Sequence, residues 1–123
     1  MPKRVLLVDD EVALARLLET YLKRLGYEVA TYSDSLQAFE AFQSSAERFD
    51  LVIADMSMPR MTGEELLRKI MEMDAGVRAL LCSGYPFCPE VLPPEIQKRF
   101  AFLLKPFLPR MLSQSIDELL ARS

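Results

Sequence analysis

The sequence predicts an α/β fold, in which a parallel sheet carries helices on both faces. Short apolar runs of strand length alternate five times with segments whose apolar residues recur at helical spacing. The expected strands begin near positions 3, 28, 51, 77 and 100, so successive starts lie 25, 23, 26 and 23 residues apart. This interval fits one strand and one crossover helix. Strands that are apolar throughout require cover on both faces, and such alternation forms parallel sheets with right-handed crossovers.

The first strand and the first helix are expected at the start of the chain. The run VLLV at positions 5–8 is continuously apolar, as in a strand that is buried on both faces. Residues at helical spacing follow it: Leu14, Leu17, Leu18, Tyr21, Leu22 and Leu25. Gly26 stands directly after this stripe, where a glycine commonly ends a helix.

The second and third strands are expected at positions 28–32 and 51–54, and each is followed by a helix with a recognisable start. Asp34 with Gln37 resembles a capping box, and Thr62 with Glu65 forms a better one. The apolar residues of these two helices are Leu36, Phe39 and Phe42 in the first, and Leu66, Leu67, Ile70 and Met71 in the second.

The fourth and fifth strands, expected at 79–82 and 100–104, enclose a segment that resists the helical pattern. This segment, 86–99, contains the prolines Pro86, Pro89, Pro93 and Pro94. Because a proline inside a helix costs about 3 kcal/mol, we expect a short helix starting near Pro94 or a broken one. Pro109 then opens the closing helix. One face of that helix carries Met111, Leu112, Ser115, Ile116, Leu119 and Leu120.

Length and composition predict a single globular domain over residues 1–123. Half of the residues are hydrophobic and 27% are charged, with a formal net charge of −3. No stretch approaches the roughly twenty apolar residues that span a bilayer, and no signal-peptide pattern opens the chain. We therefore expect a cytoplasmic protein without membrane contact. The chain has no basic stripe, which argues against direct binding of nucleic acid.

Histidine and cysteine usage excludes several kinds of site. The chain contains no histidine, which excludes imidazole acid–base chemistry, imidazole metal ligands and a role as a phosphohistidine carrier. Cys82 and Cys88 are spaced as CSGYPFC, which fits neither a redox CxxC motif nor a zinc knuckle. We expect two reduced cytosolic thiols.

Polar residues stand at the expected carboxyl ends of four strands. They are Asp9, Asp10 and Glu11 after the first strand, Asp55 at the end of the third, Ser83 after the fourth and Lys105 after the fifth. Ligand sites of parallel α/β sheets form beyond these ends, so we expect the side chains to meet in one crevice. Each alone has an ordinary explanation, such as a helix-dipole partner at Asp10 or a turn at Ser83. Their joint occurrence favours a functional site.

Three clustered carboxylates require a positive partner. Two unpaired carboxylates about 4 Å apart repel by roughly 4 kcal/mol at an effective dielectric constant near 20. Lys105 would offset part of this repulsion, and a hard divalent cation would offset the rest; all-oxygen ligands suit Mg²⁺. Mg²⁺ beside a lysine is a receptor for phosphoryl oxygens. Asp55 is then placed as a nucleophile that can become an aspartyl phosphate.

Four motifs together resemble the response-regulator receiver domains of two-component signalling. They are VDDE after the first strand, DMSMPRMTG around Asp55, SGY after the fourth strand and KPF after the fifth. The resemblance covers essentially the whole chain, and the combination is specific although each motif alone is weak. It implies a flavodoxin-like, doubly wound sheet with strand order 2-1-3-4-5 and five crossover helices, the fourth of them short or irregular.

The resemblance also implies roles for individual residues. Asp55 is similar to the phosphoacceptor of the family, Asp10 to a direct Mg²⁺ ligand and Asp9 to a ligand that acts mainly through water. The backbone carbonyl of Ser57 corresponds to a further metal ligand. The phosphoryl group would receive a hydrogen bond from Ser83 and pair with Lys105. Ser83, Lys105 and Asp55 are thus the expected catalytic residues.

Three further features follow from the resemblance. The Lys105–Pro106 peptide corresponds to one that is cis in the family. Phe102 matches an aromatic position that moves inward on activation, although a plain core phenylalanine is the alternative. Phosphorylation would draw Ser83 toward Asp55, make room for Phe102 and reshape the face built from the fourth helix, fifth strand and fifth helix. Ser57 and Tyr85 flank the position from which water attacks, and we expect them to set the dephosphorylation rate.

The leading functional hypothesis is a Mg²⁺-dependent phosphoacceptor switch that catalyses only its own phosphorylation and dephosphorylation. One alternative is a pseudo-receiver that binds partners without being phosphorylated; the complete acidic set argues against it. Another is a small phosphatase with an aspartate nucleophile, which needs a second acid two residues later, where Ser57 stands.

The expected phosphodonor is a histidine kinase or a histidine phosphotransfer domain, because this chain has no histidine of its own. The downstream partner is a protein that the sequence does not identify, and a phosphorylation-dependent dimer is left open. The segments SGYP and KPFLP resemble the receivers of hybrid sensor kinases more than those of DNA-binding regulators. Two contexts are left open: the chain is either a free-standing receiver or a domain of a larger protein.

Overall fold

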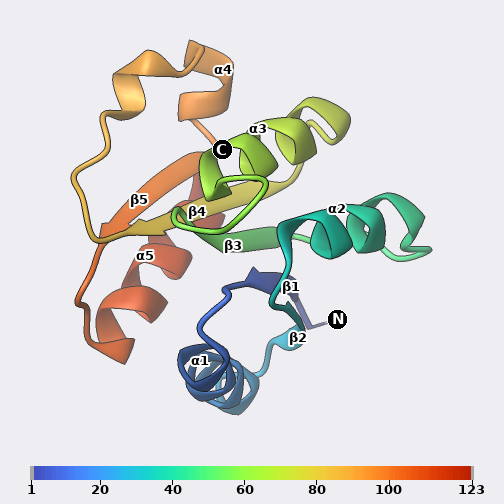
Figure 1. Cartoon of the computed structure of the whole chain (residues 1–123), viewed down its shortest axis with the longest axis vertical. Helices are drawn as coiled ribbons and strands as arrows, with labels where there is room; N and C mark the ends of the chain where they lie inside the picture. Colours follow the sequence, from blue (N-terminus) through green and yellow to red (C-terminus); the bar gives the residue numbers. More distant parts are fainter. Residues whose placement is uncertain (1, 123) are drawn as a thin grey trace.

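A computed structural model describes residues 2–122 and has five parallel strands in one sheet (Figure 1). The strands are β1 (Arg4–Val8), β2 (Glu28–Tyr32), β3 (Leu51–Asp55), β4 (Arg78–Ser83) and β5 (Phe100–Leu104). Their order in the sheet is β2-β1-β3-β4-β5, and every neighbouring pair is parallel. The predicted fold class and strand order are confirmed. The strand order places β1 and β3 side by side at the centre, which brings their carboxyl ends together.

Helices cover both faces of the sheet. They are α1 (Val12–Arg24), α2 (Ser35–Ser44), α3 (Gly63–Met73), the 3₁₀ helix η1 (Pro89–Val91), α4 (Pro94–Gln97) and α5 (Pro109–Ala121). One buried cluster joins the sheet to α2, α3 and the segment around α4, and a second joins it to α1 and α5 (Figure 1). All residues of β3 are buried, as the continuous apolar run predicts.

Of the two predicted capping boxes, the structure contains the one at the start of α3 but not the one at the start of α2. Thr62 accepts a hydrogen bond from the backbone N–H of Glu65, whose side chain accepts one from the N–H of Thr62, so the predicted capping box is confirmed. Asp34 caps α2 by accepting a hydrogen bond from the N–H of Leu36 at 2.8 Å. The predicted capping box between Asp34 and Gln37 was wrong. The Asp34 carboxylate accepts from the N–H of the second helical residue and not from that of the third, Gln37.

The proline-rich segment 86–99 is broken, as predicted. Its regular structure consists of η1 and the four-residue helix α4, which starts at Pro94. In Figure 1 this segment forms the irregular connection between β4 and β5. Two buried or half-buried apolar side chains fix its second half, Leu92 and Ile96. The amide group of Gln97 also donates a hydrogen bond to the carbonyl of Leu92 at 2.7 Å.

Both cysteines are free thiols, in agreement with the reduced state that the sequence predicts. Cys82 lies inside β4, and burial raises the pKa of its thiol to about 12, so this thiol stays protonated at neutral pH. Cys88 is exposed in the segment before η1. Within residues 2–122, no helix is long and apolar enough to cross a membrane.

Candidate functional site

The structure brings Asp9, Asp10 and Asp55 together at the carboxyl end of the sheet. Asp9 and Asp10 follow β1, and Asp55 is the last residue of the neighbouring strand β3. One carboxylate oxygen of each residue lies within 4.8 Å of the others. Asp9 is 3% exposed and Asp55 is 6% exposed, whereas Asp10 is open to solvent. Three oxygen donors at this spacing form the kind of ligand set that Mg²⁺ prefers, so the residues fit the predicted metal.

Lys105 reaches the same cluster from the end of β5. Its Nζ atom lies 2.7 Å from Oδ1 of Asp55, 3.7 Å from Oδ2 of Asp9 and 3.9 Å from Oε1 of Glu11. Burial alone would lower the pKa of Lys105, but the hydrogen bond to Asp55 and the surrounding carboxylate charges outweigh it and raise this pKa. The lysine is therefore fully charged at neutral pH.

The single ammonium group of Lys105 does not neutralise the negative charge of these carboxylates. Burial raises the pKa of Asp9 above its usual range, against a backbone hydrogen bond from Glu11 at 2.9 Å and the charge of Lys105, which lower it. The nearby charge of Asp55 raises the Asp9 pKa further. The site thus holds more negative charge than its one lysine neutralises, which favours a cation.

Ser83 and Ser57 belong to the two chain segments beside the cluster. Ser83 ends β4 and is buried, one residue beyond Cys82, which pairs with Asp55 across the sheet. Its hydroxyl oxygen accepts a hydrogen bond from the backbone N–H of Tyr85 at 3.0 Å. Ser57 is exposed in the loop that follows Asp55. Tyr85 is exposed as well, so both residues predicted to flank the site lie at its solvent side.

Gly63, which the sequence analysis did not single out, lets α3 start directly against Asp55. A Cβ atom at this position would lie 2.2 Å from the carbonyl oxygen of Asp55 and 3.0 Å from Cδ1 of Leu81. The first contact is with backbone, which cannot move aside cheaply. The signal in the sequence was a glycine directly after the capping residue Thr62, at the first position of the helix.

We predict that Gly63→Ala destabilises the fold. The added methyl group forces α3 away from Asp55, and overpacking of this kind costs about 1–3 kcal/mol. Urea unfolding measures the loss of unfolding free energy. Gly84→Ala is the matched control, since no atom lies within 4 Å of the Cβ that it would add. Equal stability of the two variants would contradict the close approach at Gly63.

The profile of the response regulator receiver domain matches residues 5–117. The chain belongs to this family. Receiver domains are signalling modules of two-component systems, and this receiver domain carries the family's acidic cluster at the expected strand ends. No enzyme family is indicated by the match.

Curated relatives of this receiver domain differ in length. It is 32% identical to the transcriptional regulatory protein GlrR of Escherichia coli over 99% of this chain, but it spans only 27% of GlrR. It is 30% identical to the response regulator receiver protein CpdR of Brucella abortus, over 96% of this chain and 97% of CpdR. The receiver domain thus resembles parts of long regulators and whole short ones.

Solved structures support the same fold. A CheY-like receiver domain protein from Methanospirillum hungatei superposes with a TM-score of 0.85 at 29% identity, covering 98% of this chain and 94% of that one. The receiver domain of the hybrid histidine kinase CckA gives a TM-score of 0.80 at 28% identity, covering 95% of this chain and 98% of that one. TrrA from Thermotoga maritima, solved in complex with Mg²⁺-BeF, gives 0.78 at 28% identity, covering 95% of this chain and 98% of that one.

Two other predicted features of this receiver domain can be located. The Lys105–Pro106 peptide is cis, as the resemblance implies. Phe102 is half-buried in β5 and packs against the core, with its ring centroid 6.1 Å from that of Phe87. Phe87 also packs against Phe100 at 5.5 Å. The inward position of Phe87 is not predictable from the sequence, because nothing in a proline-rich loop indicates which side chain turns inward.

Proposed function

We propose that this receiver domain is a signalling switch whose Asp55 accepts a phosphoryl group from a phosphohistidine. The donor is a histidine kinase or a histidine phosphotransfer domain. The observation that carries the proposal is the pairing of Asp55 with Lys105 at 2.7 Å inside a cluster of three carboxylates. A chain without phosphoryl chemistry would have no use for this repulsive arrangement.

In the proposed transfer, a carboxylate oxygen of Asp55 forms a bond to phosphorus. The bond between phosphorus and the imidazole nitrogen of the donor breaks, and the nitrogen keeps the electron pair. Asp55 stands at the end of a fully buried strand, which holds the attacking oxygen in place. Lys105 and the hydroxyl of Ser83 would bind phosphoryl oxygens.

Asp9, Asp10, Asp55 and the carbonyl of Ser57 would hold the Mg²⁺ ion. When bound, this ion would offset the charge that builds up on the phosphoryl oxygens. Asp10 is the exposed member of the cluster and can bind the ion directly, whereas buried Asp9 would act mainly through water. Lys105 is not among these ligands, so its ammonium group would pair with the phosphoryl oxygens.

Incubation with acetyl phosphate and Mg²⁺, followed by intact mass measurement, tests the proposal. We expect one phosphoryl adduct, absent when EDTA is present. No adduct under either condition would favour the pseudo-receiver. Continuous release of phosphate from an unrelated phosphate ester would favour the phosphatase, which Ser57 at the position of a second acid disfavours. The cytoplasmic location and the hybrid-kinase context stay predictions.

The proposed switch runs from Ser83 to Phe87. A phosphoryl group that recruits the hydroxyl of Ser83 would stretch its hydrogen bond from Tyr85, two residues before the loop reaches Phe87. A hydrogen bond to a charged group contributes about 1.5–3 kcal/mol, and an aromatic pair about 0.5–1.5 kcal/mol. Phosphorylation would therefore release Phe87 from Phe100 and Phe102 and reshape the face formed by α4, β5 and α5.

We predict that Phe87→Ala makes the unphosphorylated protein resemble the phosphorylated wild type over residues 84–102. Loss of the two aromatic contacts frees the segment, so its backbone amides should exchange with deuterium faster. Hydrogen exchange with mass spectrometry measures the effect in both states. Val91→Ala is the control, because Val91 lies in the same segment but is exposed. Phosphorylation that leaves exchange over 84–102 unchanged in the wild type would contradict the prediction.

A further inference from the structure

The loop between β3 and α3, residues 56–62, is held at its ends by backbone hydrogen bonds and in the core by two inward side chains. The backbone N–H of Met56 donates to the carbonyl of Cys82 at 2.8 Å, and the N–H of Gly63 donates to the carbonyl of Met56 at 3.0 Å. Met58 and Met61 are buried in the core. None of these contacts involves Ser57, Pro59 or Arg60, the exposed residues of the loop.

Arg60 stands in this exposed middle and has an unfavourable backbone. Its φ is 70°, in the left-handed region that favours glycine, and it is the one non-glycine residue with positive φ among residues 2–122. The N–H of Met61 donates to the carbonyl of Pro59 at 2.8 Å, which closes a tight turn around Arg60. Such a conformation persists where surrounding contacts enforce it.

Asp34 supplies that contact from α2. One carboxylate oxygen of Asp34 caps α2 by accepting from the N–H of Leu36 at 2.8 Å, and the other forms an ion pair with the guanidinium of Arg60. The Asp34 side chain is only 20% exposed, although that of Arg60 is 61% exposed. One half-buried carboxylate therefore contacts both the start of α2 and the turn at Arg60.

We propose that Arg60 and Asp34 are a positioning pair for the metal-binding loop. By holding the left-handed turn against α2, the pair would keep the loop in one shape, so that the carbonyl of Ser57 could serve as the proposed metal ligand. The inference rests on the proposed function, since it gives the pair a role toward the proposed Mg²⁺ site. It extends that function to two residues that lie outside the acidic cluster.

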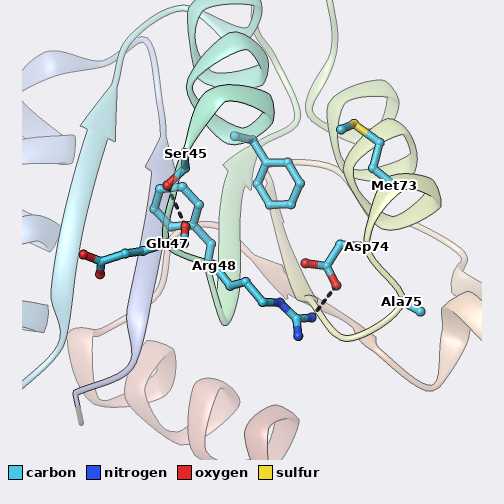
Figure 2. Close-up of a pocket in the computed structure, with 8 residues that line it drawn as sticks. Ser45, Glu47, Arg48, Met73, Asp74 and Ala75 are labelled. Carbon is cyan, nitrogen blue, oxygen red and sulfur yellow. Dashed lines mark hydrogen bonds and ion pairs between the residues drawn. The ribbon is translucent and has the colours of Figure 1, made fainter.

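A second ion pair, between Arg48 and Asp74, provides the control for the Arg60 pair. Arg48 bonds Asp74 at 2.7 Å, with side-chain exposures of 72% and 17%, close to those of the Arg60 pair. Figure 2 shows this pair among the residues that line a pocket, together with Ser45, Glu47 and Met73. It lies at the opposite end of the sheet from the acidic cluster, so Arg48→Ala is the matched control for loss of a partly exposed ion pair.

Hydrogen exchange without added metal tests the structural half of the proposal. We expect faster amide exchange over residues 56–62 in Asp34→Asn and Arg60→Ala, and unchanged exchange there in Arg48→Ala. Asparagine keeps the cap of α2, because it is as good an N-cap residue as aspartate, so Asp34→Asn removes the ion pair alone. Unchanged exchange in Asp34→Asn would overturn the proposal.

Titration with Mg²⁺, followed by amide chemical shifts in NMR spectra, tests the other half. We expect Asp34→Asn to weaken binding about two- to fivefold, the effect that a pair of this exposure can supply. In an Arg60→Gly background, where glycine accepts the left-handed turn, Asp34→Asn should have no further effect. Additive effects of the two substitutions would overturn the inference. A wild-type protein that binds no Mg²⁺ would contradict the proposed function itself, whatever the exchange data show.

Discussion

Asp55→Asn takes up no phosphoryl group from acetyl phosphate in the presence of Mg²⁺. The carboxamide has the size of the carboxylate but lacks its nucleophilic charge, so the attacking oxygen is lost while the strand around it stays packed. The loss should be complete, because the substitution removes the nucleophilic oxygen itself and does not merely change its surroundings. Intact mass measured over time, with the wild type treated in parallel, reads out the adduct.

Asp50→Asn is the matched control for this experiment. Asp50 immediately precedes β3 and accepts a hydrogen bond from the N–H of Arg4 at 2.8 Å, at the far end of the same strand. An asparagine can accept that bond, and we expect normal phosphoryl uptake. An adduct that persists in Asp55→Asn would mean that another acid, such as Asp9 or Asp10, accepts the phosphoryl group.

The sequence predicts the main components of the site because topology dictates where they meet. Asp9 and Asp55 are separated by 46 positions in the chain, yet Asp9 directly follows β1 and Asp55 ends β3, the strand beside it in the sheet. Parallel strands that are neighbours in a sheet bring their carboxyl ends to one edge. Once the alternation of strands and helices is recognised, the meeting of the acids with Lys105 follows without knowledge of any side-chain contact.

Contacts that depend on tertiary packing were not predictable in the same way. Proline spacing predicts that the segment before β5 breaks, but not that Phe87 turns onto Phe100 and Phe102. Similarly, Asp34 is recognisable as a cap, but its second oxygen pairs with Arg60 across 26 positions. No local pattern encodes such a pairing, because each partner by itself is an ordinary surface residue.

Lys105→Met has two opposite effects on the site. Phosphoryl uptake should fall about 10²- to 10³-fold, as when one preorganised donor to a developing charge is removed. Mg²⁺ should bind more tightly than in the wild type, because the ammonium group that competes with the cation for Asp9 and Asp55 is gone. Rates of adduct formation and a calorimetric Mg²⁺ titration measure the two effects.

The metal-free stability of Lys105→Met separates a changed site from a damaged fold. Removal of one partner from a fully buried ion pair costs about 3–5 kcal/mol, and we expect about 1–3 kcal/mol here because Lys105 keeps some contact with solvent. Added Mg²⁺ should restore most of this loss, since the cation neutralises the carboxylates that the substitution leaves unpaired. A variant that merely misfolds would lose phosphorylation and Mg²⁺ binding together. Weaker Mg²⁺ binding in a folded Lys105→Met protein would show that the lysine and the cation do not share the same carboxylates.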